Sequence, residues 1–284
     1  MAKPKEEKKI SVIEITEGVF QLYIVGKTPL ILNRMSEKAR QELLCPKGRK
    51  GAAEKAVTIK HDVIAEFRAS AHTLKDSKAP TLLAIPAAAP KRAIATAALD
   101  LPGAKKAQIG RLCWVPGEYL PVYGKPQLLI STVRNSDMNH TPDQRTRVIV
   151  PHWACLLTIN FAQPILSPEV VSRLLVAAGF YVGVGDWRNE KGAGNYGQFR
   201  VLTPEEAKKD EEVRLIMKDG RKVQEKAMAN PDCYDDESAD LLAHFLKEME
   251  LRGKKITKRD GYPEVEMAGR GLERLVASGN GAEA

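Results

Sequence analysis

Cysteine is scarce in this 284-residue chain, and no stretch is apolar for the ~18 residues that a membrane-spanning helix requires. The first nine residues are charged and no apolar segment follows them, so we expect no secretory signal. The scattered cysteines form no CxxC pair, which argues against a zinc ribbon or a redox dithiol. These absences predict a cytoplasmic protein with reduced thiols that does not interact with membranes. The cysteines are Cys45, Cys113, Cys155 and Cys233.

The sequence also lacks the motifs of common catalytic and metal-binding sites. It contains no HxH, HxxxH or HExxH spacing and no GxSxG element, so we expect no metal and no cofactor. Five histidines are present, and His61 is the candidate for a general acid or base, with Tyr23 or Lys60 beside it. Because a single histidine is more often structural, the sequence favours a non-catalytic protein.

Positive charge is concentrated in part of the chain. The formal net charge is +8, with 44 basic and 36 acidic residues. Up to Leu202 there are 29 basic and 17 acidic residues, whereas the remainder has 15 and 19. Two basic segments, 45–60 and 91–111, are suited to neutralising phosphates, although a merely lysine-rich surface would have the same composition. The residues that we expect to contact phosphates there are Lys47, Arg49, Lys50, Lys91, Arg92, Lys105 and Lys106.

The order of apolar patterns predicts an α+β fold with three regions. Residues 1–16 have the composition of a mobile charged tail, and residues 17–202 alternate strand-like and helix-like segments. We expect strands at 20–25, 112–115, 119–123, 128–133, 148–161 and 198–202. Helices are expected at 36–44, 63–74, 86–99 and 167–178, the last starting at Ser167 and ending at Gly179. Residues 203–284 are charged and predict a helical C-terminal region with an apolar stripe from Leu241 to Met249.

A glycine-rich segment follows the helix predicted at 167–178. Its glycines indicate positive φ angles or close approach to a ligand. The segment follows a helix and precedes a strand, which is the reverse of a phosphate-binding P-loop or a dinucleotide-binding turn. Two interpretations remain: the aromatic residues are core residues of a wide hairpin, or the loop stacks bases and holds phosphates. The glycines are Gly183, Gly185, Gly192, Gly194 and Gly197, and the candidate contacts are Trp187, Arg188, Lys191, Tyr196 and Arg200.

A helix, a G-x-G-x(n)-G-x-G loop and a strand in this order resemble the signature of the RAMP superfamily. These are ferredoxin/RRM-like RNA-binding proteins of CRISPR effector complexes, and they include the Cas7 backbone subunits. The segment from Gly26 to Arg40, and the GVGDWR run at 183–188 with Lys191, Gly192, Gly197 and Phe199, are also similar to a family of uncharacterised phage proteins. The phage likeness covers about 20–202, while the RAMP likeness depends mainly on the loop, which here is longer and carries Asp186 and Glu190.

The resemblance implies a ferredoxin/RRM-like antiparallel core with inserted helices and a helical C-terminal appendage. It implies non-catalytic binding of single-stranded nucleic acid, with RNA favoured over DNA, by a Cas7-like subunit. Such a subunit would form a homo-oligomer or filament along the strand, within a larger ribonucleoprotein. The acidic C-terminal region would contact the basic face of a neighbouring subunit, or else cover its own. Two alternatives remain: a Cas6-like RNA-processing endoribonuclease, and a phage structural or interaction protein that imitates an RNA-binding subunit.

Overall fold

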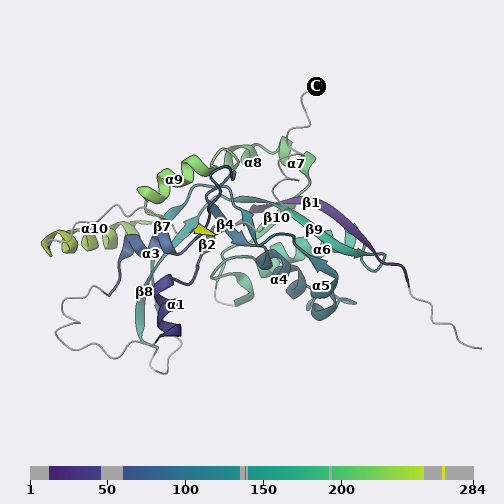
Figure 1. Cartoon of the computed structure of the whole chain (residues 1–284), viewed down its shortest axis with the longest axis horizontal. Helices are drawn as coiled ribbons and strands as arrows, with labels where there is room; N and C mark the ends of the chain where they lie inside the picture. The colour runs from purple at the N-terminus through teal and green to yellow at the C-terminus, as the bar shows by residue number, and fades with distance from the viewer. Residues whose placement is uncertain are drawn as a thin grey trace, which may run out of the picture.

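The protein has an α+β fold in which three small sheets lie between two groups of helices (Figure 1). The computed structural model describes residues 13–45, 60–134, 138, 140–191, 194–252 and 264–265. Lys47, Arg49, Lys50 and Gly192 lie outside the described residues, as does most of the N-terminal segment 1–16. No helix in these ranges is both long and apolar enough to cross a membrane.

The first sheet pairs a strand near the start of the chain with strands that lie much later in it. Its strand order is β10-β1-β9-β5, and every neighbouring pair is antiparallel. The longest pairing places Thr16 opposite Gln163 and Val25 opposite Ala154. Since successive side chains of a strand point to opposite faces, this register presents one apolar set on each face of the sheet. The strands are β1 (Thr16–Gly26), β5 (Cys113–Trp114), β9 (Ala154–Gln163) and β10 (Phe199–Leu202).

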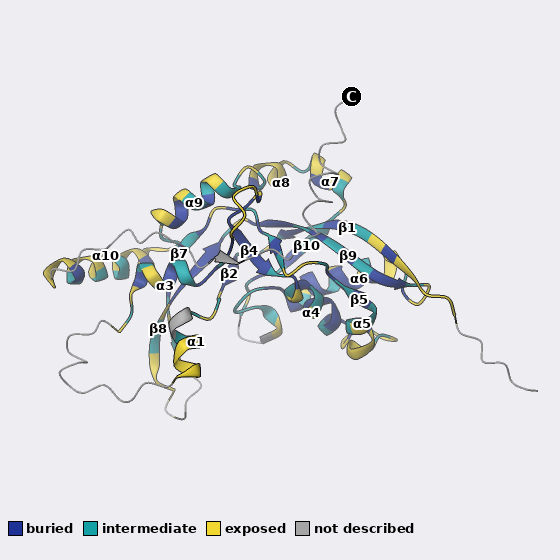
Figure 2. Ribbon diagram, in the orientation of Figure 1, coloured by how far each residue is buried: buried dark blue, intermediate teal, exposed yellow. Residues whose placement is uncertain are grey.

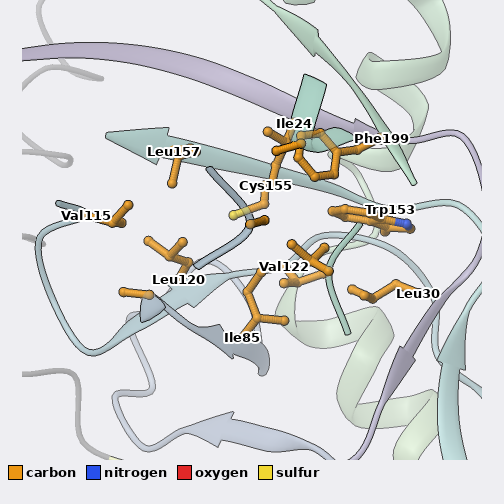
Figure 3. Packing of buried hydrophobic residues seen from close by; sticks show 14 of the residues in the cluster. Ile24, Leu30, Ile85, Val115, Leu120, Val122, Trp153, Cys155, Leu157 and Phe199 are labelled. Atoms are coloured by element: carbon orange, nitrogen blue, oxygen red, sulfur yellow. The ribbon is translucent and has the colours of Figure 1, made fainter. Parts of the chain in front are cut away.

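Helices cover both faces of this sheet. On one face, α4 (Ala88–Ala97) and α6 (Pro168–Ala177) contribute to the main core with Ile24, Leu157 and Phe199. Figure 3 shows these three side chains converging near Trp153 and Cys155. On the other face, α7 (Pro204–Lys209) and α8 (Glu211–Ile216) bury Val25 and Ala154 in a smaller cluster. Figure 2 shows the strands as the buried centre, with exposed residues mainly on the outer helices.

Apart from β11, which follows β10 in the chain, the other two sheets are built from segments inserted between the strands of the first. One has the order β2-β8-β7 and the other β11-β3-β4-β6. Their strands are β2 (Leu30–Leu32), β7 (Gln127–Arg134), β8 (Pro142–Val150), β3 (His72–Leu74), β4 (Leu83–Pro86), β6 (Tyr119–Pro121) and β11 (Glu264–Val265). The accompanying helices are α1 (Glu37–Leu44), α3 (Val63–Ala69) and α5 (Lys106–Leu112).

The C-terminal helices are joined to the body through buried polar side chains. Gln224 of α9 (Arg221–Ala229) is fully buried, accepts from the backbone N–H groups of Leu82 and Leu83, and donates to the carbonyl of Val122. Ser238 of α10 (Asp236–Leu251) is also fully buried, and its hydroxyl accepts from the N–H of Ile130 in β7. Because β7 is the last strand of its sheet, α10 covers an edge that would otherwise expose unpaired backbone groups.

Several element predictions are confirmed and three are wrong. The strand expected at 20–25 and the helix capped by Ser167 are present. The helix expected at 63–74 ends at Ala69, and residues 72–74 form β3 instead. The single strand expected at 148–161 is two strands, with a break after Val150. Gly179 does not end its helix, because a wider helical turn, η1 (Ala178–Val182), extends it to Gly183, where φ is +77°.

Candidate nucleic-acid interface

A cleft of about 640 Å³ lies between α4, strands β2 to β4 and the start of the glycine-rich loop. Its buried lining is mostly apolar and includes Ile31, Leu32, Ala84, Ile85, Ala93, Val182 and Val184. Its more exposed lining is mostly polar and includes Asn33, Arg92, Thr96, Lys106, Asp186, Arg188 and Glu190. The cleft therefore has an apolar floor and a charged rim.

The glycine-rich loop forms one wall of the cleft because its backbone is tied to β2 and to the chain just before it. The N–H of Asp186 donates to the carbonyl of Ile31 at 2.9 Å, and the N–H of Gly197 donates to the carbonyl of Pro29 at 2.9 Å. Within the loop, the N–H of Val184 donates to the carbonyl of Gly197 at 3.0 Å. These three bonds hold both ends of the loop together.

Two of the predicted loop glycines are required by close backbone approach. A Cβ atom at Gly197, where φ is +71°, would lie 1.7 Å from the carbonyl oxygen of Val184. A Cβ atom at Gly194 would lie 1.6 Å from the carbonyl oxygen of Trp187. No side chain fits at such distances, so the glycines allow the loop to fold back upon itself. The sequence indicated this property correctly, although the close neighbour is the loop's own backbone.

Trp187 and Tyr196 pack beside the cleft, against the β2-β8-β7 sheet. Their rings lie 6.1 Å apart with an interplanar angle of 40°, and both are half-buried on a cluster built from Ile31, Leu129 and Ile149. Neither ring lines the cleft. This packing agrees with the interpretation that these aromatic residues stabilise the loop.

Arg147 of β8 completes this packing, and no sequence pattern singled it out. Its guanidinium carbon lies 5.0 Å from the centroid of the Trp187 ring, and its side chain is only 9% exposed. Burial lowers the pKa of Arg147, and the carboxylate of Asp186, 3.2 Å from Nε, opposes this effect. Asp186 in turn accepts a hydrogen bond from Asn33 at 3.0 Å. The loop is thus attached to β8 by a partly buried charge pair, in addition to its backbone bonds to β2 and to Pro29.

The cleft brings together cations that lie far apart in the sequence. Arg92 of α4 and Lys106 of α5 line the rim opposite Arg188 of the loop. Neither Arg92 nor Lys106 has an ion-pair or hydrogen-bond partner within the described part of the chain. Arg188 is already engaged, because its guanidinium binds Glu190 at 2.6 Å and donates to the carbonyl of Gly185 at 3.1 Å.

Arg200 and two lysines of the second basic segment do not belong to the cleft lining. Arg200 is held by two acidic residues of the C-terminal region, with Nη1 2.6 Å from Asp210 and Nη2 2.8 Å from Glu212. The hydrogen bond to Asp210 is the main cause of a raised pKa at Arg200. Lys91 and Lys105 do not line the cleft. Lys191 ends a short helical turn, η2 (Asn189–Lys191).

His72 is a cleft residue that sequence reasoning missed. Its ring centroid lies 5.0 Å from that of Tyr119, and its Nδ1 atom is buried with no hydrogen-bond partner among the described residues. Burial lowers the pKa of His72 to about 4, and the nearby charges of Arg34 and Arg40 act in the same direction. The imidazole is therefore neutral at physiological pH. A histidine after a short helix carries no sequence signal for such a position.

His61 lies in a charged cluster that occupies both of its ring nitrogens. Nδ1 is 2.9 Å from Glu66, and Nε2 is 2.9 Å from Asp143. Burial raises the pKa of Asp143, but hydrogen bonds from Lys60 and His61 outweigh it, so that the net pKa is lowered. Tyr23, the other proposed neighbour, instead packs in the cluster of Val25 and Ala154. The cluster thus ties the start of α3 to β8.

The described residues contain no group of three or more histidine, cysteine or acidic side chains arranged to hold a metal ion.

A comparison with protein-family models gives no match to the chain, and a comparison with curated proteins likewise gives none.

Proposed function

We propose that the protein binds single-stranded nucleic acid without catalysis, with RNA favoured over DNA, through the cleft beside the glycine-rich loop. The observation that supports this most strongly is the convergence on one cleft of Arg92 and Lys106, from one basic segment, with the loop residues 183–186 and Arg188. Two cations on one rim, neither paired with another described residue, are suited to neighbouring phosphates of a strand.

The arrangement of the first sheet supports the ferredoxin/RRM-like core that this proposal includes. Taken in chain order, β1, α4, β5, β9, α6 and β10 form a β-α-β-β-α-β unit. Their order in the sheet, β10-β1-β9-β5, is fourth, first, third, second, which is the ferredoxin-like order. In this interpretation the glycine-rich loop joins the second helix to the last strand, as in the RAMP proteins that the sequence resembles.

Assembly into a homo-oligomer or filament, within a larger ribonucleoprotein, is part of the same proposal. Helix α10 carries exposed acidic residues, and the α4–α5 side of the molecule carries exposed basic residues at its other end (Figure 1). A head-to-tail contact between such ends would extend as an open filament.

The four free cysteines favour a reducing compartment such as the cytoplasm.

Fluorescence anisotropy with labelled single-stranded RNA and DNA, at low and high salt, tests the binding proposal. We expect Arg92→Ala/Lys106→Ala to weaken binding about tenfold or more at low salt. Each lost phosphate contact should reduce the slope of log affinity against log salt by about 0.7. The matched control is Lys208→Ala/Lys209→Ala, which removes two exposed charges from α7 on the opposite face of the first sheet. Absence of saturable binding at low salt by the unmodified protein would end the proposal.

A further inference from the structure

The cleft has the size of a site for a small ligand group, and its deeper lining is mostly apolar. Its volume of about 640 Å³ is within the ~300–1,000 Å³ typical of small-molecule sites. The deepest residues are aliphatic and tightly packed, with Ala84 and Val184 at 1% exposure or less, so the apolar surface open to a ligand includes the half-exposed Pro86 and Ala89. A phosphate would gain nothing from such a surface, because burial without hydrogen bonds disfavours a charge. The floor therefore suits an apolar part of a ligand, whereas the rim suits a charged part.

The rim supplies the complementary charge. Arg92 lies on the same face of α4 as the cleft residues Ala89, Ala93 and Thr96, one turn apart along the helix. Lys106, at the start of α5, lines the same cleft. A ligand whose apolar ring reached the floor would therefore keep an attached phosphate beside these two cations.

His72 adds a neutral polar group to this cleft. Its low pKa keeps the imidazole uncharged, and a neutral imidazole has one donor and one acceptor nitrogen. Such a group is compatible with the polar edge of a base, whereas a charged imidazolium would bind phosphate and draw it inward. The cleft thus combines a neutral interior with a rim that carries Arg92 and Lys106 on the helical side and the Arg188–Glu190 pair on the loop side.

We propose that the cleft takes one unstacked base of the bound strand, with the adjoining phosphates held by Arg92 and Lys106. This inference rests on the proposed function, and it adds that the strand is bound with a base turned out of its stack. Unstacking costs least in single strands, which is the substrate class inferred above. The ligand is thus a nucleotide within a chain, and its base is the part that enters the floor.

A strand carrying one 2-aminopurine tests this inference, because the fluorescence of that base rises when it leaves the stack. No tryptophan, tyrosine or phenylalanine is among the described residues that line the cleft, so no aromatic ring from this lining would quench it. The probe is placed at each position of the strand in turn. At the position whose base enters the cleft, we expect the fluorescence to rise severalfold on saturation with the unmodified protein. Ala89→Trp and Thr96→Trp, at half-exposed cleft positions, should each abolish that rise while weakening binding less than tenfold.

Ala88→Trp is the matched control, since Ala88 is exposed, adjacent, and not part of the cleft lining. It should retain the full rise, and all three variants should unfold at similar temperatures. Binding without a rise at any probe position, or a rise that survives both cleft substitutions, would overturn the inference and leave the proposed function standing. Absence of binding by the unmodified protein would overturn both.

Discussion

Arg188 and Glu190 neutralise each other at the rim of the cleft, where the guanidinium and the carboxylate lie 2.6 Å apart. A similar relationship holds behind them, where Asp186 lies 3.2 Å from Arg147. The loop therefore presents paired charges, while Arg92 and Lys106 across the cleft have no partner among the described residues. An incoming phosphate meets two available cations on the helical side and must displace Glu190 to reach the third.

Removing the carboxylate of Glu190 should strengthen binding. In Glu190→Gln, Arg188 is released from its partner and one negative charge leaves the rim, so we expect affinity for single strands to rise about three- to tenfold at low salt. Anisotropy titrations measure this. Glu248→Gln is the control, because it also removes one carboxylate from an arginine, here Arg252 just after α10, which lies 3.4 Å away. Equal effects of the two substitutions would show that only net charge matters.

The backbone of the loop should not tolerate a side chain at Gly197. Gly197→Ala combines a positive φ with an impossible approach to the carbonyl of Val184, so we expect a loss of more than about 3 kcal/mol in the free energy of unfolding. Gly103→Ala is the control, because Gly103 has a φ of +82° but a Cβ added there would meet no atom within 4 Å. It should cost only about 1–2 kcal/mol from backbone strain. Urea denaturation measures the free energy of unfolding of both variants. Similar losses in the two variants would contradict the loop geometry.

Acid should destabilise the protein partly through His72. The unfolded histidine binds a proton below its ordinary pKa of 6.5, whereas the folded one stays neutral until about pH 4. Stability contributed by the neutral imidazole is therefore complete above pH 6.5 and is lost as the pH falls towards 4, by roughly 3 kcal/mol. Between pH 7 and pH 4.5, the free energy of unfolding should decline less steeply for His72→Gln than for the unmodified protein. An unchanged slope would contradict the burial of this ring.

The C-terminal helices should be indispensable to the body. Gln224→Met removes the acceptor of the Leu82 and Leu83 N–H groups and leaves buried backbone donors unsatisfied. We expect a loss of about 3 kcal/mol or more in the free energy of unfolding. Gln108→Met, at an exposed position of α5, is the control and should be nearly neutral. A Gln224 variant as stable as its control would indicate that α9 is a removable appendage.

Local signals predicted the elements whose determinants are local. Ser167 followed by Pro168 predicted the start of α6, because a hydroxyl cap and a fixed φ act within one turn. The boundary at Ala69 was missed, because the β3–β4 pairing of residues 72–74 outweighs the helical spacing of that segment. The break after Val150 was missed because both strands are apolar, so their composition carries no boundary.

The candidate site likewise has features that the sequence predicted and features that it did not. By itself, the sequence determined that a glycine-rich loop with cations follows a helix, and that positive charge is concentrated before residue 203, since composition and spacing suffice for both. Only the tertiary structure decided which cations meet: Arg92, Lys106 and Arg188 share one cleft, whereas Arg200 is paired with Asp210. The half-buried His72 and the buried Arg147 and Gln224 carry no local signal, because their surroundings come from distant segments. Pairing and burial depend on the folded chain, and they determine which charges remain available to a ligand.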